Sequence, residues 1–171
     1  MTFSVHDLSV PVFVSGLRNM RGWLDKADGA REGDLLGAKL APDMRPLPAQ
    51  YQMASDTAKN ALGRLTGTDA PAMADTEASF AELQERCDRT IAYLEGIDPA
   101  ALANSADRSI EMRFPNSMGY NWTGARYLTG FALPNFFFHM TTAYAILRAN
   151  GVALGKPDFL QHLGPPDVLP A

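Results

Sequence analysis

The chain has only one cysteine, Cys87, among its 171 residues, so it cannot form an internal disulfide. No histidine or glycine-rich turn lies next to Cys87 in the sequence, and these are the surroundings that usually activate a thiol. The residues around it, 85–89, are typical of a helix. We therefore expect Cys87 to be a half-buried helical residue and not a reactive nucleophile.

Clusters of basic residues and long apolar runs are also missing. The formal net charge is −4, and without a basic surface we expect no nucleic-acid partner. The N-terminus lacks the basic segment and the apolar core of a signal sequence. The longest apolar run, around Phe131, is interrupted by Pro134 and Asn135 and is too short to cross a bilayer. These absences predict a soluble, cytoplasmic protein with no membrane partner.

Motifs that would indicate a reaction are absent as well: the sequence contains no nucleophile–base motif, no glycine-rich phosphate loop and no cysteine pair. With 46% hydrophobic residues, the chain can bury the core of one domain, which we expect to span residues 1–171. Four segments repeat apolar side chains every three or four residues, at about 7–31, 47–65, 76–95 and 123–150. Residues 151–171, rich in Pro and Gly, are expected to lie on the surface as a C-terminal tail.

Residues between the third and fourth helices follow a different period. Ser109–Phe114 alternate polar and apolar side chains, 115–119 favour a turn, and Tyr120–Trp122 can form a second strand. We expect the third helix to begin at an N-cap of Asp75 or Thr76. The expected fold class is all-α, a four-helix bundle with a small β-hairpin before the last helix.

The last expected helix has Thr123 as its N-cap and Gly151 as its C-terminal stop. Pro134 lies inside this helix and should kink it or divide it in two. The segment Phe131–Phe138 is apolar on all sides, and such a helix is buried by its neighbours or by a second subunit. We therefore expect a homodimer.

Two polar residues interrupt this apolar segment. Asn135 and His139 are four residues apart, which places them on one face of a helix. Buried polar groups need partners, so this pair is the first candidate for a functional site. In the simplest interpretation, His139 is a core histidine bonded to Asn135 or to a backbone carbonyl, and Asn135 can alternatively cap a half-helix that begins at Pro134. Replacing His139 by Ala would then leave Asn135 unpaired, which costs about 1–3 kcal/mol.

Several segments of the chain resemble a family of uncharacterised bacterial proteins: Leu8-Ser-Val-Pro-Val-Phe13, Ala41-Pro-Asp-Met44, Ala54-Ser-Asp-Thr-Ala-Lys59, and residues 132–148 with Asn135-Phe-Phe-Phe-His139. That family is similar to the DinB/YfiT-like superfamily of metal-dependent enzymes, some of which are thiol-dependent transferases. The resemblance implies a four-helix bundle that is often dimeric. It also implies a divalent metal held by one histidine of the second helix and a His-x-x-x-His pair of the last helix.

On this resemblance, the pair of the last helix falls on Asn135 and His139, so an amide replaces one imidazole. No histidine lies within 47–65, where Gln52 or Met53 would take the place of the second-helix ligand. An asparagine oxygen suits Ca²⁺ or Mg²⁺ better than Zn²⁺ or Ni²⁺. The resemblance therefore implies a degenerate metal site.

Asp56 lies close to the position of the missing ligand, but on the side opposite to the apolar face, where it is solvated and Lys59 can pair with it. The candidate metal ligands are His139, Asn135 and Asp56. Gln52, Trp122 and Tyr127 complete the candidate binding residues, the two aromatic ones either as packing at one end of the bundle or as groups that stack on a ligand.

Two functions remain open. In the first, the bundle keeps a pocket in which His139 acts on a small molecule as a general base or as a single metal ligand. The protein would then be an enzyme, and a divalent-metal-dependent transferase or hydrolase is one form of this function. In the second, the metal site has decayed, and the protein is a small-molecule-binding or non-catalytic dimeric module without a cofactor. An open pocket with convergent polar groups favours the first function, and a dry, tightly packed surround to His139 favours the second.

Overall fold

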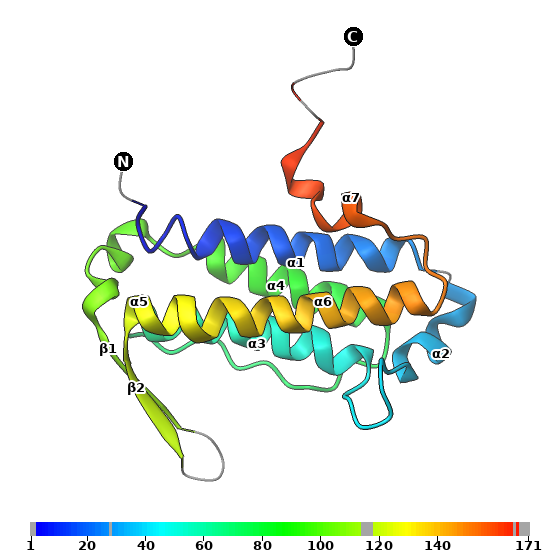
Figure 1. Ribbon diagram of the computed structural model, residues 1–171, viewed down its shortest axis with the longest axis horizontal. Coiled ribbons are helices and arrows are strands. Elements are labelled where there is room, and N and C mark those ends of the chain that lie inside the picture. The colour runs from blue at the N-terminus through cyan, green and yellow to red at the C-terminus, as the bar shows by residue number, and fades with distance from the viewer. Residues whose placement is uncertain (1–2, 28, 114–117, 166, 168–171) are drawn as a thin grey trace.

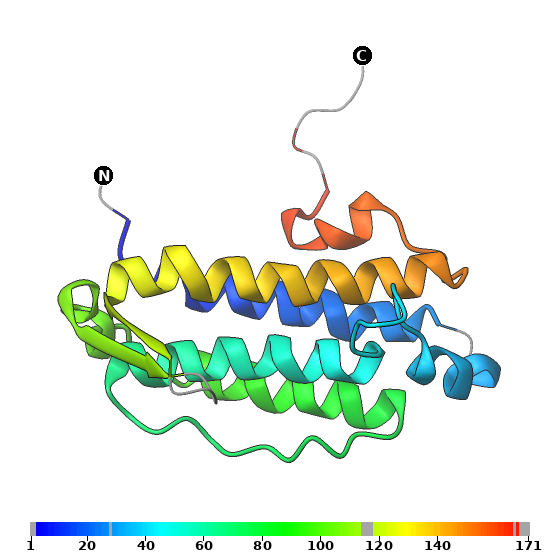
Figure 2. The ribbon, with the colours of Figure 1, turned by 60° about the horizontal axis from the view of Figure 1, so that its bottom comes forward.

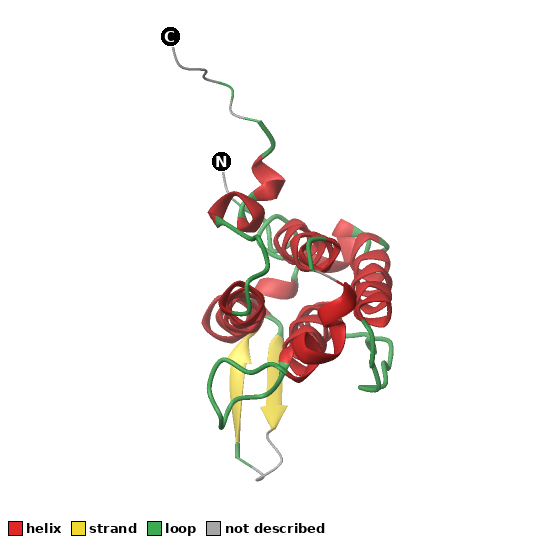
Figure 3. Ribbon diagram, turned by 90° about the vertical axis from the view of Figure 1, so that its right-hand side faces the viewer, coloured by secondary structure: helices red, strands yellow, loops and turns green. Residues whose placement is uncertain are grey.

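Four long helices form a bundle in the computed structural model, which describes residues 3–27, 29–113, 118–165 and 167 (Figure 1). The helices are α1 (Val10–Asp25), α3 (Leu47–Thr66), α4 (Phe80–Glu95) and α6 (Leu133–Ala149). Both α3 and α1 pack against α4 and α6, so the four helices surround one core, as the view along the bundle shows (Figure 3). Within the described residues, no helix combines the length and the apolar character that a membrane span requires.

The helices α3 and α4 run in the same direction, because the connection between them returns along the length of the bundle (Figure 2). This connection, residues 67–79, begins at Gly67, whose φ of 77° ends α3 in the left-handed conformation. The helix α4 begins at Phe80 and not at 76, so the expected N-cap at Asp75 or Thr76 is wrong. Ser79 is the N-cap: its Oγ accepts from the N–H of Glu82, and the Glu82 carboxylate accepts from the N–H of Ala78. The spacing Ser-x-x-Glu is the sequence signal for this start.

The first expected helix is shorter in the structure than its sequence pattern indicated. It ends at Asp25, and a short helix, α2 (Glu32–Gly37), lies between it and α3. The reason lies in the apolar stripe, which stops at Leu24. Leu24 is the last buried residue of α1, so the burial that stabilises the helix ends there.

The hairpin is present as expected, with β1 (Ser109–Arg113) antiparallel to β2 (Gly119–Thr123). Ile110 pairs with Trp122 across the strands, and the side chains of Ile110 and Met112 are buried against the bundle. Phe114, which was expected to end the first strand, lies outside the described residues. After the hairpin, the Thr123 Oγ1 accepts from the N–H of Arg126, which confirms the N-cap.

The last helix is continuous from α5 (Gly124–Tyr127) to Ala149, so the expected division at Pro134 is wrong. A π turn, Leu128–Ala132, joins α5 to α6, and the N–H of Leu133 bonds to the carbonyl of Leu128 five residues back. A wider turn of this kind is one way in which a helix absorbs the hydrogen bond that a proline cannot make. Gly151, with a φ of 86°, ends the helix as expected.

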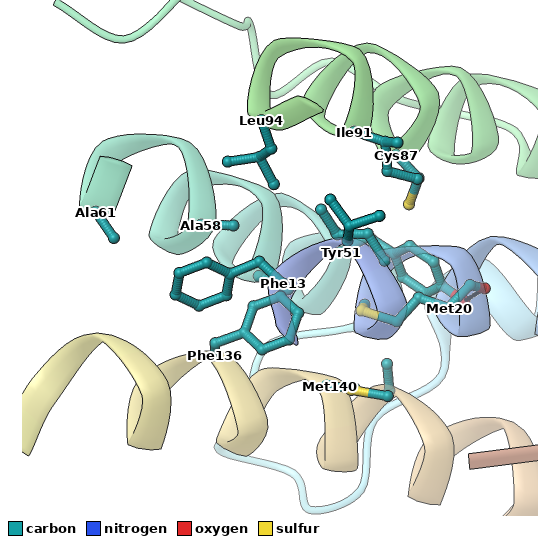
Figure 4. Close-up of a cluster of buried hydrophobic side chains, with 14 of the residues drawn as sticks. Phe13, Met20, Tyr51, Ala58, Ala61, Cys87, Ile91, Leu94, Phe136 and Met140 are labelled. Atoms are coloured by element: carbon teal, nitrogen blue, oxygen red, sulfur yellow. Dashed lines mark hydrogen bonds between the residues drawn. The ribbon is translucent and has the colours of Figure 1, made fainter. Parts of the chain in front are cut away.

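The core between α1 and α6 depends on one close approach. The rings of Phe13 and Phe136 meet edge to face with centroids 5.0 Å apart (Figure 4). A Cβ at Gly16 would lie 2.6 Å from the Phe136 ring, so only glycine lets the two helices pack this closely. Cys87 is fully buried rather than half-buried, and burial raises the pKa of its thiol to about 12. It is therefore an inert core residue.

The C-terminal segment lies on the surface, as expected, but it is held there by specific contacts. After Gly151, the side chains of Val152 and Leu154 are buried. The short helix α7 (Lys156–Phe159) then packs over α1 (Figure 1). The indole N–H of Trp23 donates to the Asp158 carbonyl at 3.1 Å, and the ring of Phe159 stacks on Trp23 at 5.7 Å.

The segment Phe131–Phe138 is not buried on every side within one chain. Phe136 is fully buried, whereas Phe137 and Phe138 are 39% and 56% exposed. One face of α6 therefore carries two adjacent aromatic side chains to the surface. The homodimer stays a prediction, and we expect Phe137 and Phe138 to form its interface.

We expect light scattering at tens of micromolar to give twice the chain mass of 18.6 kDa. Phe138→Asp should yield the monomer mass, because the carboxylate would be desolvated at the contact. Phe3→Asp is the matched control, since Phe3 is 74% exposed on the N-terminal segment and is not part of α6, and its change should leave the dimer intact. A monomer mass for the wild-type chain would contradict the prediction.

Candidate functional site

A cavity of about 330 Å³ lies between α3, the last helix and the hairpin. Its lining from α3 consists of Met53, Asp56, Thr57, Asn60 and Arg64. The last helix contributes Tyr127, Phe131, Asn135 and His139, and the hairpin contributes Met112 and Arg113. The cavity therefore contains four of the six sequence-predicted site residues: Asn135, His139, Asp56 and Tyr127.

The π turn aligns the four residues of the last helix. Tyr127, Phe131, Asn135 and His139 follow one another at steps of four, and each such step in a straight α-helix advances the side chain by about 40°. Over three steps Tyr127 would point about 120° away from His139. The π turn takes up one additional residue, which returns about 100° of that difference. Tyr127 thus faces the same cavity as His139 because of the π turn at 128–132.

Three hydrogen bonds join α3 to the last helix along this cavity. The His139 Nδ1 lies 2.9 Å from the Gln50 Oε1, and the Asn135 Nδ2 donates to the Thr57 Oγ1 at 2.7 Å. The Arg64 Nη1 donates to the Tyr127 hydroxyl at 3.2 Å. The partners on α3 are seven residues apart, so each lies two turns beyond the last. The two structural roles expected of Asn135 are therefore wrong: it neither pairs with His139 nor caps a half-helix.

The contacts of Gln50 determine which nitrogen of His139 carries the proton. The Gln50 Nε2 donates to the Arg45 carbonyl at 3.0 Å, so its Oε1 faces the imidazole. An amide oxygen can only accept, and the Nδ1 of His139 must therefore be protonated. The lone pair then resides on Nε2, which forms no hydrogen bond with any described residue. Burial lowers the pKa of His139, which is 8% exposed, so the imidazole is neutral at pH 7.

Asp56 is engaged by two cations and is 34% exposed, so it is solvated only in part. Its Oδ1 lies 2.8 Å from the Arg86 guanidinium and 3.1 Å from the Lys59 ammonium, which confirms the expected pair with Lys59. Arg86 is 2% exposed and also bonds to Glu77 and Asp75 of the connection 67–79. The sequence signal for Arg86 is its place on the apolar stripe of α4, beside Leu83 and Cys87.

Gln50, and not Gln52, is the α3 residue that contacts His139. The Gln52 amide donates to the Glu77 carboxylate at 2.8 Å, away from the cavity lining. Sequence reasoning missed Gln50, although it stands three residues after Leu47 and four before Ala54, on the same apolar stripe. A polar residue in such a stripe is the signal that could have found it.

Trp122 lies behind the cavity. Its ring stacks on Phe131 at 5.8 Å and on Tyr120 at 4.6 Å, and together with Phe131 it lines a second hollow. Tyr127 is almost fully buried, with its hydroxyl at the cavity. Of the two aromatic candidates, Tyr127 alone lines the cavity that also contains His139.

The donor atoms around His139 do not fit a transition-metal site. Within the described part of the chain, no three His, Cys, Asp or Glu side chains are grouped closely enough to hold one ion. His139 offers a single imidazole nitrogen, Asn135 offers an amide oxygen, and the carboxylate of Asp56 is held by Lys59 and Arg86. Zn²⁺ and Ni²⁺ normally require three protein ligands with imidazole or thiolate prominent.

Replacing His139 by Ala leaves the Oε1 of Gln50 unpaired, and not Asn135 as the sequence suggested. We expect the free energy of unfolding to fall by about 1–3 kcal/mol in His139→Ala and in Gln50→Ala, measured by urea denaturation. The double variant should show a coupling of about 0.5–3 kcal/mol. Gln52→Ala is the matched control, and its effect should add to that of His139→Ala within about 0.5 kcal/mol. Additive effects for Gln50 and His139 would contradict the hydrogen bond.

Comparison with known proteins agrees with this architecture. Residues 5–160 match the model of a family described as Domain of unknown function (DUF1993). The crystal structure of a DinB family member protein from Shewanella denitrificans shares 39% sequence identity with the chain, covering 98% of this chain and 96% of that chain, with a TM-score of 0.84. None of the curated proteins matches the chain. The expected fold, a DinB-like four-helix bundle with a small hairpin, is therefore confirmed, and the chain belongs to the DUF1993 family.

Proposed function

We propose that the protein binds a small molecule in the cavity between α3 and the last helix, with the Nε2 of His139 as the acceptor of a hydrogen bond or a proton from that molecule. One observation carries the proposal. The chain of contacts from the Arg45 carbonyl through Gln50 to the Nδ1 of His139 fixes the neutral imidazole with its lone pair on Nε2. A partner that orients a histidine in this way is typical of functional imidazoles.

The size and lining of the cavity support a small-molecule ligand. A volume of about 330 Å³ is at the lower end of the range for such sites. Polar side chains converge on it from two helices, and Met53, Met112 and Phe131 provide apolar surface between them. An open, partly polar cavity favours a binding or catalytic function over a purely structural histidine.

The chemistry that the residues can supply is proton transfer without a bound metal. Burial lowers the pKa of His139, so its imidazole stays neutral over a pH range in which a free histidine would already be charged. In that pH range it can still accept a proton from a bound molecule. Asn135 presents its amide oxygen one turn from His139, because Thr57 engages the amide nitrogen. The pair can thus receive two donor groups of one ligand. The alternative function is that of a divalent-metal-dependent enzyme, but the side chains around His139 do not supply the donor atoms that a transition metal requires.

Acylation by diethyl pyrocarbonate tests whether Nε2 is reactive and accessible. The chain has three histidines, so His6→Asn with His162→Asn leaves His139 alone. We expect one acylated histidine per chain by intact mass, because the reagent attacks an unprotonated nitrogen. The rate should fall to half below pH 6.5, the ordinary pKa of histidine, since burial lowers the pKa of His139.

The unfolded chain in urea is the control, and its acylation rate should fall to half at a pH near the ordinary pKa of histidine. Adding His139→Gln to the double variant should abolish the modification. A native chain that stays unmodified, while the unfolded chain reacts, would show that His139 is closed off and would overturn the proposal.

Metal content tests the role of the histidine independently. Protein purified without chelator should contain far less than one Zn²⁺ or Ni²⁺ per chain by plasma mass spectrometry, because a single imidazole binds these ions weakly. The small content should be the same in His139→Ala. One equivalent of metal in the wild-type chain, lost in His139→Ala, would restore the metal-dependent enzyme as the better proposal.

A further inference from the structure

We propose that the ligand of this cavity is an elongated molecule with a carboxylate or phosphate at one end, and that Arg64 binds this anionic group. The inference rests on the proposed function of the cavity and assigns its ligand class. Three observations support it: the balance of charge in the lining, the way Arg64 is held, and the position of Arg64 relative to His139.

Arg64 is the charged residue of the lining that has no counter-ion among the described residues. Three residues of the lining carry a charge at pH 7, namely Asp56, Arg64 and Arg113. Asp56 is balanced by Lys59 and Arg86, and Arg113 is paired with Glu111. No described carboxylate lies within ion-pair distance of Arg64. The cavity therefore presents one uncompensated positive charge, which favours an anionic ligand.

Arg64 is an exposed residue, and the partner that its guanidinium contacts is neutral. Its Nη1 donates to the Tyr127 hydroxyl at 3.2 Å, and its central carbon lies 5.8 Å from the centre of the Tyr127 ring. Tyr127 is almost fully buried, so its ring is packed on all sides by the core. An arginine has five N–H donors in a planar fork, so one bond to Tyr127 leaves donors for two oxygens of a carboxylate or phosphate.

Arg64 lies at the end of the cavity opposite to His139. Along α3 the three contacts with the last helix come in the order Gln50, Thr57 and Arg64, so the pair of Thr57 and Asn135 separates Arg64 from His139. Gln50 and Arg64 are about 20 Å apart along the helix axis. A ligand that reaches both the arginine and the imidazole must therefore be elongated. Its anionic group would bind at Arg64, and its hydrogen-bond or proton donor would meet the Nε2 of His139.

Titration of the protein with butyrate, butyramide and inorganic phosphate tests this assignment. Butyrate and butyramide have nearly the same shape and differ in charge. Followed by amide and side-chain nuclear magnetic resonance, butyrate and phosphate should shift the signals of Arg64 and Tyr127 saturably, and butyramide should bind at least about tenfold more weakly. Arg64→Gln should weaken butyrate binding by about tenfold or more, and Arg64→Lys should restore part of it.

Arg126→Gln is the matched control, because Arg126 is an exposed arginine next to Tyr127 in the sequence that does not line the cavity. It should leave butyrate binding unchanged. The circular dichroism and the melting temperature of Arg64→Gln establish that the variant is folded. If it is not folded, the comparison of butyrate with butyramide on the wild-type chain still decides between an anionic and a neutral ligand.

The outcomes separate this inference from the proposed function. Equal binding of butyrate and butyramide, or butyrate binding that Arg64→Gln leaves intact, would overturn the anionic ligand while the small-molecule site stands. Absence of butyrate and phosphate binding at tens of millimolar would overturn it as well. The acylation of His139 does not involve Arg64, so its failure would instead remove the proposed function itself.

Discussion

The pairing of α3 with the last helix is the constraint on which the site depends. Gln50, Thr57 and Arg64 each bond to a residue of the opposite helix, and these contacts set the spacing and the rotation of the two helices. The π turn at 128–132 makes the third contact possible, because it rotates Tyr127 into line with His139. The cavity is thus a product of helix pairing, and its polar lining consists largely of the residues that hold the helices together.

Buried charge keeps the parallel arrangement of α3 and α4 in place. Arg86 of α4 bonds to Asp56 of α3 and, on its other side, to Asp75 and Glu77 of the returning connection. A guanidinium that is almost fully buried requires such partners, since a desolvated cation without them is strongly destabilising. The same network balances the charge of Asp56 through its Oδ1. The charge available there is consequently that of Arg64, and the base available is His139.

Much of the fold follows from local patterns in the sequence. The apolar spacing of three and four residues located the four helices, and the alternation at Ser109–Phe114 located the hairpin. Thr123, Gly67 and Gly151 act on their own neighbours, so the boundaries they mark were recognisable without tertiary information. The start of α4 at Ser79 is equally local. An N-cap at Asp75 or Thr76 was expected instead, because these residue types are also favourable N-caps.

Asn135 and His139 were recognisable as site candidates from sequence, because two polar residues on one face of an apolar helix require partners. Their partners were not, since Thr57 and Gln50 are 78 and 89 residues away along the chain. Periodicity reports which side chains share a face of one helix, but it contains no information about which face of another helix will lie opposite. The protonated nitrogen of His139 and the contact of Arg64 with Tyr127 were therefore decided only when α3 and the last helix packed together.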